Sequence, residues 1–460
     1  MTQTIQRKLN DSVFVRWSAL ILIALMMFFA YMFVDMLSPL KSQLESTLGW
    51  DGGTFGTYAA SEYFLNVFCF FLIFAGIILD KMGIRFTGLL SASLMVIGAA
   101  IKFYGMSDLF IGSELELWLN SWWVSLPATA KVSCLGFMIF GCGCEMAGTT
   151  VSKAIAKWFK GKEMAMAMGL EMSIARLGVF AAMWLSPMVS EAFGDSGVAG
   201  VVSAPVAFGT VLLLIGLIFY SVFVVLDAKF DKQLKAAGEF SEEASEEEFK
   251  LSDLGKIFSS KMFWLVAMLC VLYYSAIFPF QRYAPDYLAV TLGTDSATGA
   301  QLFSCFPILA MVLTPALGAF IDNKGKAASM LMVGSLVMIA CHLSFAFLLP
   351  AFPSKVLAIT IIVILGVSFS LVPAALWPSV PKIIDERILG SAYCVIFWIQ
   401  NIGLFAVPKL IGEVLDATGG YTLPMVIFSS FGLFALFFGL WLKREDKVKG
   451  YGLELPNIKK

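Results

Sequence analysis

The stretch GIILDKMGIRFTG at residues 76–88 recurs in similar form as GAFIDNKGKAASM at residues 318–330. Both copies read Gly-x-x-x-Asp-x-x-Gly, and a basic residue follows one or two positions later. Each copy lies at the end of an apolar run, and the two runs are six apart along the chain. Two copies at equivalent places predict a membrane protein built from two related halves.

Each residue type in this motif has a local use. The first glycine, Gly76 or Gly318, permits close contact between helices. The second glycine permits a tight turn, and the aspartate can cap the next helix or pair with the basic side chain. We therefore expect latches between conformations, rather than substrate contacts, at Asp80, Gly83, Arg85, Asp322, Gly325 and Lys326.

The composition is that of an integral membrane protein. Of the 460 residues, 59% are hydrophobic and 14% are charged, and the mean hydropathy is +0.84. A soluble domain has about 25% charged residues. The net charge of −1 argues against a nucleic-acid partner. Twelve apolar runs are long enough to cross a bilayer, and they begin near Arg16, Thr54, Ile84, Val132, Met164, Val201, Met262, Thr298, Ala327, Lys355, Leu389 and Tyr421.

Lysine and arginine are divided unevenly between the two sides of these runs. With both termini inside, the inner segments hold 25 of the 32 and the runs themselves hold three. The outer segments hold four, which are Lys41, Lys102, Lys131 and Lys355. Because cytoplasmic loops collect positive charge, both termini are predicted to be cytoplasmic.

The predicted fold class is an all-α integral membrane protein with two six-helix halves. We assign residues 1–227 to the first half, 228–260 to an acidic cytoplasmic linker, 261–445 to the second half and 446–460 to a cytoplasmic tail. The outer loop after the third run contains Trp118, Trp122 and Trp123. Since tryptophan favours the membrane interface, we expect a short amphipathic segment there.

Four longer stretches resemble the lysosomal dipeptide transporter branch of the major facilitator superfamily. They are YMFVDMLSPLKSQL at 31–44, GCGCEMAGTTVSKAIAKWFKGKEMAMAMGLEMSIARLG at 141–178, VLYYSAIFPF at 271–280 and ALWPSVPKIIDERILGSAYCVIFWIQNIGL at 375–404. The resemblance implies facilitated transport of dipeptides by two halves that rock about a central site. It also implies that an acid on the fourth helix and an arginine on the fifth face the two charged ends of the substrate. Those positions are Glu145 and Arg176 here.

The sequence departs from that branch in three ways. Glu171 and Glu62 stand where the branch has no acid, and the acidic dileucine tail that directs the animal protein to lysosomes is missing. The missing sorting signal points to a bacterial inner membrane. The extra acids leave a second possibility, a proton-coupled symporter of peptides or small organic anions that uses Glu62 or Glu171, since a buried carboxylate can bind a proton near neutral pH.

Arg176 and Glu145 are expected at the same depth. By helical rise, Glu145 lies roughly 18 Å and Arg176 roughly 21 Å above the inner surface. A guanidinium matches a carboxylate with two parallel hydrogen bonds, and Glu145 offers a counter-charge for an α-ammonium group. The alternative is a permanent Glu145–Arg176 ion pair that only braces two helices.

Uncharged candidates for the same central site lie on the seventh, tenth and eleventh runs. They offer hydrogen bonds or apolar walls, although packing is an equally good explanation for each. These residues are Tyr273, Tyr274, Trp377, Trp398, Gln400 and Asn401. Nearer the outer surface, Asp35, Glu62 and Arg282 come from both halves, and they form either an outer gate or simply exposed interface charges.

Other classes of function are disfavoured by the sequence. There is one histidine, His342, and neither an HExxH zinc motif nor a GxSxG nucleophile elbow. We therefore expect no enzyme, no metal site and no cofactor. The eight cysteines lie within or beside apolar runs and are expected to be reduced. The expected partners are a small-molecule substrate (a dipeptide or another zwitterion or anion) and membrane lipid, with the protein as a monomer.

Overall fold

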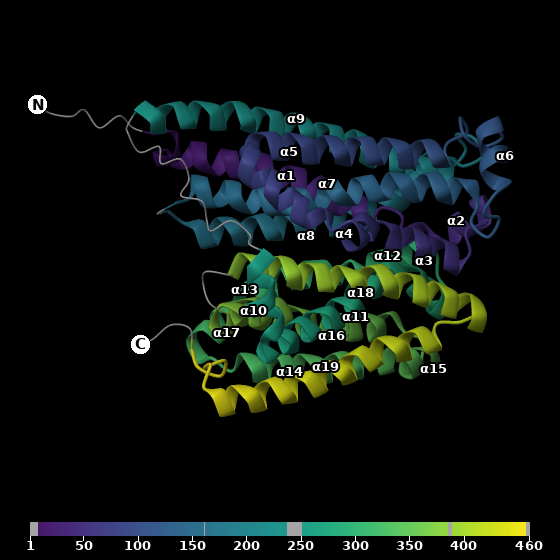
Figure 1. The fold of residues 1–460 in the computed structure, drawn as a ribbon. Coiled ribbons are helices and arrows are strands. Elements are labelled where there is room, and N and C mark those ends of the chain that lie inside the picture. The colour runs from purple at the N-terminus through teal and green to yellow at the C-terminus, as the bar shows by residue number, and fades with distance from the viewer. Residues whose placement is uncertain (1–7, 161, 237–250, 385–388, 457–460) are drawn as a thin grey trace, which may run out of the picture.

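The computed structural model describes residues 8–160, 162–236, 251–384 and 389–456, and these residues form helices and connecting turns without strands. Figure 1 shows two helix bundles side by side, the N-terminal one in purple to teal and the C-terminal one in green to yellow. The start of α1 and the end of α19 lie at the same end of the molecule, which we call the inner end. Part of the predicted linker and tail (237–250 and 457–460) lies outside the described residues.

The helices follow one another in two series. The N-terminal bundle contains η1 (Leu9–Asp11), α1 (Val13–Val34), η2 (Ser38–Leu40), α2 (Lys41–Leu48), α3 (Gly52–Ser61), α4 (Phe64–Phe68), α5 (Phe71–Met106), α6 (Glu114–Asn120), α7 (Ala128–Trp158), α8 (Met164–Ala192) and α9 (Gly200–Ala236). The C-terminal bundle contains α10 (Leu251–Ser259), α11 (Lys261–Leu292), α12 (Ser296–Phe303), α13 (Cys305–Lys324), α14 (Ala327–Leu343), η3 (Ser344–Leu348), α15 (Leu349–Ala351), α16 (Lys355–Leu376), η4 (Trp377–Ser379), α17 (Val380–Ile383), α18 (Leu389–Thr418) and α19 (Thr422–Lys449).

Eleven of the described helical segments are long and apolar enough to cross a membrane. The predicted second crossing differs from these because it is divided into α3, α4 and the first part of α5. That part ends at Gly83, where the backbone leaves the helix before α5 continues as the third crossing. The eleven segments and this divided helix account for the twelve predicted crossings.

The two repeat motifs form the turns that were predicted. Gly83 and Gly325 have φ angles of +73° and +75°, which a side chain would disfavour. Of the two roles considered for Asp80, capping the next helix or pairing with Arg85, the pairing is not found, because each side chain meets a longer-range partner. Asp80 pairs with Lys153 of α7 at 2.9 Å, and Arg85 pairs with Asp231 of α9 at 3.0 Å.

Close helix contact at the first motif glycines is also not observed. A Cβ atom built on Gly76 or Gly318 would meet no described atom within 4 Å. In the second motif, the main chain bonds to the C-terminal segment instead. The amide of Lys326 donates to the carbonyl of Glu454 at 3.1 Å, and Ser329 Oγ donates to the Glu454 carboxylate at 2.7 Å.

Smaller predictions can also be compared with the structure. The short helix expected in the outer loop is α6, with Trp118 60% exposed on it. All eight cysteines are free. His342 is completely buried and packs against the rings of Phe280 and Phe428, as expected for a packing residue.

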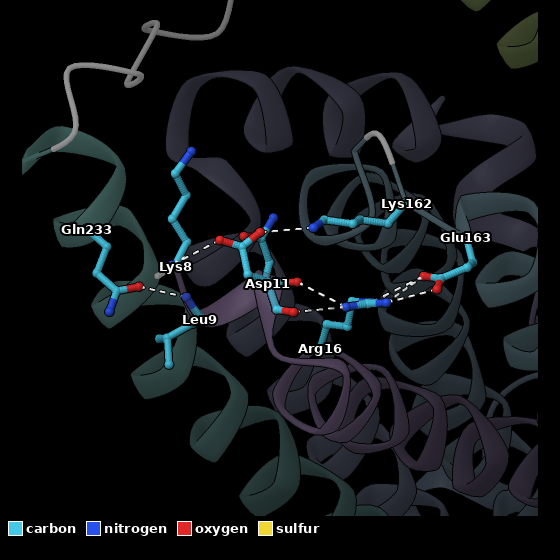
Figure 2. Close-up of polar contacts among 8 residues, drawn as sticks. Lys8, Leu9, Asp11, Arg16, Lys162, Glu163 and Gln233 are labelled. Atoms are coloured by element: carbon cyan, nitrogen blue, oxygen red, sulfur yellow. Dashed lines mark hydrogen bonds and ion pairs between the residues drawn. The ribbon is translucent and has the colours of Figure 1, made fainter. Parts of the chain in front are cut away.

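The N-terminal segment is tied to the inner end of its own bundle (Figure 2). Arg16, which is 5% exposed, donates to both carboxylate oxygens of Glu163 at 2.8 and 3.0 Å. Lys162 Nζ donates to Asp11 at 2.9 Å, and the amide of Leu9 donates to Gln233 of α9 at 2.8 Å. Charge-assisted hydrogen bonds therefore link the segment to the start of α8, and a neutral hydrogen bond links it to α9.

These contacts predict when acid should release the segment. Hydrogen bonding to Lys162 lowers the pKa of Asp11 below its ordinary 3.8, and hydrogen bonding to Arg16 lowers the pKa of Glu163 below its ordinary 4.5. Because both folded-state pKa values are depressed, the stabilisation is complete above pH 4.5 and is lost as the pH falls through the lowered values. The protection factors of residues 8–16, that is, their hydrogen–deuterium exchange rates corrected for the pH dependence of chemical exchange, should therefore stay constant from about pH 7 to 5 and fall below about pH 4. The Glu163→Gln variant should exchange faster already at neutral pH; equal protection in that variant would contradict the prediction.

Candidate functional site

Arg176 lies in the centre of α8, surrounded by aromatic rings from both bundles. Its guanidinium carbon is 5.9 Å from the ring centre of Tyr31 on α1. It is 5.5 Å from the ring centres of both Phe278 on α11 and Phe369 on α16. Such cation–π contacts stabilise a guanidinium that has left water. None of these three aromatic residues was singled out from the sequence.

The carboxylates near Arg176 do not form ion pairs with it. Among the described residues, no ion pair within 4 Å joins Arg176 to Glu145 or Glu171, and Glu145 has no hydrogen bond. Both glutamates are half-buried. The permanent Glu145–Arg176 brace is therefore not observed, and both groups are available to a ligand.

A row of aromatic side chains in the C-terminal bundle leads away from Arg176. Tyr274 stacks on Phe278 with ring centres 5.3 Å apart. The indole Nε1 of Trp377 donates to the Tyr274 hydroxyl at 3.1 Å, and Phe397 stacks on Trp377 at 4.9 Å. Tyr274 and Trp377, both predicted site residues, therefore belong to one continuous apolar wall.

Two predicted site residues are engaged within the C-terminal bundle instead. The hydroxyl of Tyr273 donates to the carbonyl of Leu331 and contacts Ser335 Oγ at 2.6 Å, which directs it towards α14. Gln400 accepts a hydrogen bond from the Cys270 thiol at 3.3 Å. Packing explains both side chains, so we do not keep them as substrate contacts.

Asn401 is different because its amide nitrogen is buried without an acceptor among the described residues. Asn66 on α4, which the sequence did not single out, is 1% exposed, and neither its amide nitrogen nor its oxygen has a partner there. The neighbouring Val67 carbonyl accepts from Trp398 Nε1 at 3.0 Å, so α4 and α18 adjoin at this level. Buried amides without partners are costly, and in a central site they are candidate ligand contacts.

The Trp398 contact also explains the division of the second crossing. After α4 the chain turns at Phe70, whose φ of +52° is unusual for a residue with a side chain. In a continuous helix, the Val67 carbonyl would accept a hydrogen bond from a main-chain amide of the same helix. Here it accepts one from a side chain of α18 instead. Phe70 stacks on Trp398 at 5.4 Å. Irregular backbone at membrane depth is tolerated when protein groups satisfy it.

Asp35, Glu62 and Arg282 meet in one buried cluster nearer the outer end. Arg282 of α11 donates to Glu62 at 2.6 Å and lies 3.6 Å from Asp35. It also donates to the carbonyl of Val34, while Gln281 donates to Asp35 at 2.6 Å. The three charged residues are at most 6% exposed. The sequence left open whether these charges are exposed, and the structure buries them at the contact between the bundles.

Main-chain packing reinforces this contact. The amides of Gly52 and Gly53 on α3 donate to Asp416 of α18 at 2.7 and 2.6 Å. A Cβ atom on Gly56 would overlap the carbonyl of Pro408, and one on Gly412 would overlap that of Gly52. Small residues thus let the α3 and α18 backbones touch. These contacts hold the two bundles together at the outer end.

The comparisons with known proteins give the class of protein. The family model described as Major Facilitator Superfamily matches residues 23–408, and the chain belongs to this superfamily of membrane transporters. It is a multi-pass integral membrane transporter and not an enzyme.

The chain is similar to individual members of this superfamily. The chain is 28% identical to the lysosomal dipeptide transporter MFSD1 of Danio rerio, over 95% of this chain and 88% of that protein. It is also 28% identical to the Bos taurus protein of the same name, over 79% of this chain and 71% of that protein. The crystal structure of the nucleoside transporter NupG has the same fold, with a TM-score of 0.67, 15% identity and coverage of 93% of this chain and 99% of that one.

The buried cluster predicts the effect of removing its cation. Arg282→Met removes the ion-pair partner that Asp35 and Glu62 share, and breaking such a buried pair costs about 3–5 kcal/mol. The contact at the outer end should therefore be destabilised, and exchange of the α3 amides should accelerate in hydrogen–deuterium exchange. Lys409→Met is the matched control, because Lys409 is half-exposed in a 3.9 Å pair with Glu413. Unchanged exchange of α3 in Arg282→Met would contradict the assigned importance of the cluster.

Proposed function

We propose that this protein carries dipeptides across a membrane by alternating access, as a facilitative uniporter. The observation that supports this best is Arg176, an arginine at the meeting point of α1, α8, α11 and α16 that has no carboxylate partner among the described residues. An arginine inside a membrane protein is costly and is commonly kept for a ligand. The similarity to dipeptide transporters agrees with this reading.

The proposed site recognises the two charged ends of a zwitterion. Arg176 binds the substrate carboxylate with its planar fork, and its aromatic surroundings keep competing water away. Glu145 binds the α-ammonium group. The unpartnered amides of Asn66 and Asn401 hold the peptide bond, and the wall formed by Tyr274, Trp377 and Phe397 accepts varied side chains.

The proposed cycle uses the outer cluster as a gate. In the closed arrangement Arg282 joins α11 to Asp35 and Glu62, which blocks the outer route to Arg176. Separation of these charges opens the outer end, while the inner end closes about the motif turns at Gly83 and Gly325. Residues 1–227 and 261–445 are then the two moving halves, joined by the linker 228–260.

The charge distribution along the chain supports one orientation in the membrane. The surplus of lysine and arginine in the inner segments supports cytoplasmic termini, including the tail 446–460. We propose that the protein works as a monomer in a bacterial inner membrane.

A second candidate is proton-coupled symport of peptides or small organic anions. Its specific support is the pair of membrane-embedded glutamates, Glu62 and Glu171, both of which interact with an arginine. Glu62 would bind a proton when Arg282 withdraws, and Glu171 when a substrate occupies Arg176. Proton coupling would let the protein accumulate substrate in response to a proton gradient. A uniporter can only bring the substrate to equal concentrations on the two sides.

The binding role of Arg176 is tested by a substitution that keeps its charge. Arg176→Lys removes the two-point match to a carboxylate, and the loss of one charged hydrogen bond corresponds to about 10–100-fold weaker binding. Thermal stabilisation by dipeptides in detergent should fall accordingly. Arg444→Lys, at an exposed position of α19 with no assigned role, is the control. Undiminished dipeptide binding in Arg176→Lys would favour a structural arginine.

The coupling mode is tested in proteoliposomes. Labelled dipeptide should equilibrate without any pH or voltage gradient, and an imposed inward proton gradient should not produce accumulation above equilibrium. Glu171→Gln should leave this equilibration intact if transport is uniport. Uptake that occurs only with a proton gradient, and is lost in Glu62→Gln or Glu171→Gln, would establish the symport alternative.

A further inference from the structure

Lys102 occupies a position that the sequence did not predict. By sequence it was counted among the outer segments, but it lies inside α5 with no exposed surface. Its ammonium nitrogen has no hydrogen-bond acceptor among the described residues. A buried, unpaired ammonium group is strongly unfavourable unless something else compensates it.

Three aromatic rings provide part of that compensation. Lys102 Nζ is 4.3 Å from the ring centre of Phe33, 5.0 Å from Tyr58 and 4.6 Å from Phe137. These rings come from α1, α3 and α7, so every contact lies within the N-terminal bundle. The cage holds a cation next to the outer cluster without giving it a carboxylate partner.

The cage and the outer cluster share one ring. Phe137 also lies 5.6 Å from the guanidinium carbon of Arg282, so two cations contact the same side chain. Arg282 in turn contacts Asp35 and Glu62, so the Phe137 ring lies between Lys102 and the outer cluster. The other titratable groups that face Lys102 are Tyr58 and Cys134, which carry no charge as phenol and thiol. The local charge therefore consists of two carboxylates and two cations.

These four charges are divided unequally between the bundles. Asp35, Glu62 and Lys102 belong to the N-terminal bundle, whereas Arg282 belongs to α11. When the outer end opens, Arg282 leaves with the C-terminal bundle. The N-terminal bundle then retains two carboxylates, and Lys102 is the nearby cation that moves with them.

We propose that Lys102 is a positioning residue for the outer gate, which leaves its aromatic cage and neutralises Asp35 or Glu62 when Arg282 withdraws. A lysine suits this task because its ammonium group is a compact charge on a flexible four-carbon stem. Without it, opening would leave two like charges close together in a low-dielectric environment. This inference rests on the proposed gate role of Arg282 and requires no particular substrate.

The test compares Lys102→Met in two backgrounds. Spin labels at Ser46→Cys on α2 and Thr418→Cys on α18 report the separation of the outer ends by pulsed electron paramagnetic resonance, after the eight native cysteines have been replaced. Lys102→Met should reduce the long-distance, outer-open population about 5-fold or more, as is typical for coupled sites. In the Glu62→Gln background, where one carboxylate is already neutral, the same substitution should have little effect.

Controls make the outcome decisive. Lys131→Met removes an outer lysine whose Nζ donates to the carbonyls of Leu119 and Trp122, and it should leave the distance distribution unchanged in both backgrounds. Exchange of the α3 amides in protein with its native cysteines provides a second readout that does not depend on labelling. An outer-open population in Lys102→Met equal to that of the parent, or an equal loss in both backgrounds, would overturn the proposal. Because neither measurement uses a dipeptide, failure of the transport assays would leave this result interpretable.

Discussion

The contact between the two bundles depends on the buried guanidinium of Arg282. Asp35 and Glu62 end helices of one bundle, and Arg282 extends from α11 of the other, so neither bundle satisfies its own charges. Complementary charge fixes register more reliably than it adds stability, because desolvation offsets much of the attraction. The cluster therefore specifies how the bundles meet, and the close α3–α18 backbones follow from that alignment.

The central site and this cluster are electrostatically connected. A Cβ atom on Gly141, one turn before Glu145 on α7, would overlap the carbonyl of Glu62, so the segments that carry the two carboxylates are in contact. A charge that arrives near Glu145 therefore changes the potential at the proposed gate. In a two-state transporter, such differential interaction is what allows a ligand to shift the conformational equilibrium.

The sequence was informative where a charged residue or a repeated motif stood within or beside an apolar run. Arg176 and Glu145 are conspicuous in apolar runs, and the repeated motif reveals the two-half organisation. The aromatic cage of Arg176 was not predictable, because Tyr31, Phe278 and Phe369 are ordinary residues in a chain with 14% aromatic content. Their importance arises only when four helices converge.

Long-range contacts account for the other failures of prediction. The division of the second crossing carries no proline signal, and it depends on Trp398, which lies 331 residues away from Val67. Lys102 looked like a loop residue because positive charge usually marks a membrane edge. Its three rings come from separate helices, which no local pattern could bring together.

The glycine contacts between α3 and α18 have a kinetic consequence. Where main chain meets main chain at Gly52, Gly56 and Gly412, there are no long side chains to disentangle when the surfaces part. Few side-chain rotamers need to change at this contact, and few interdigitated side chains must come apart before the two backbones can separate. Such a seam would contribute little to the activation barrier for rocking, so the rate of the motion would be set by the buried charges rather than by the hydrophobic surface.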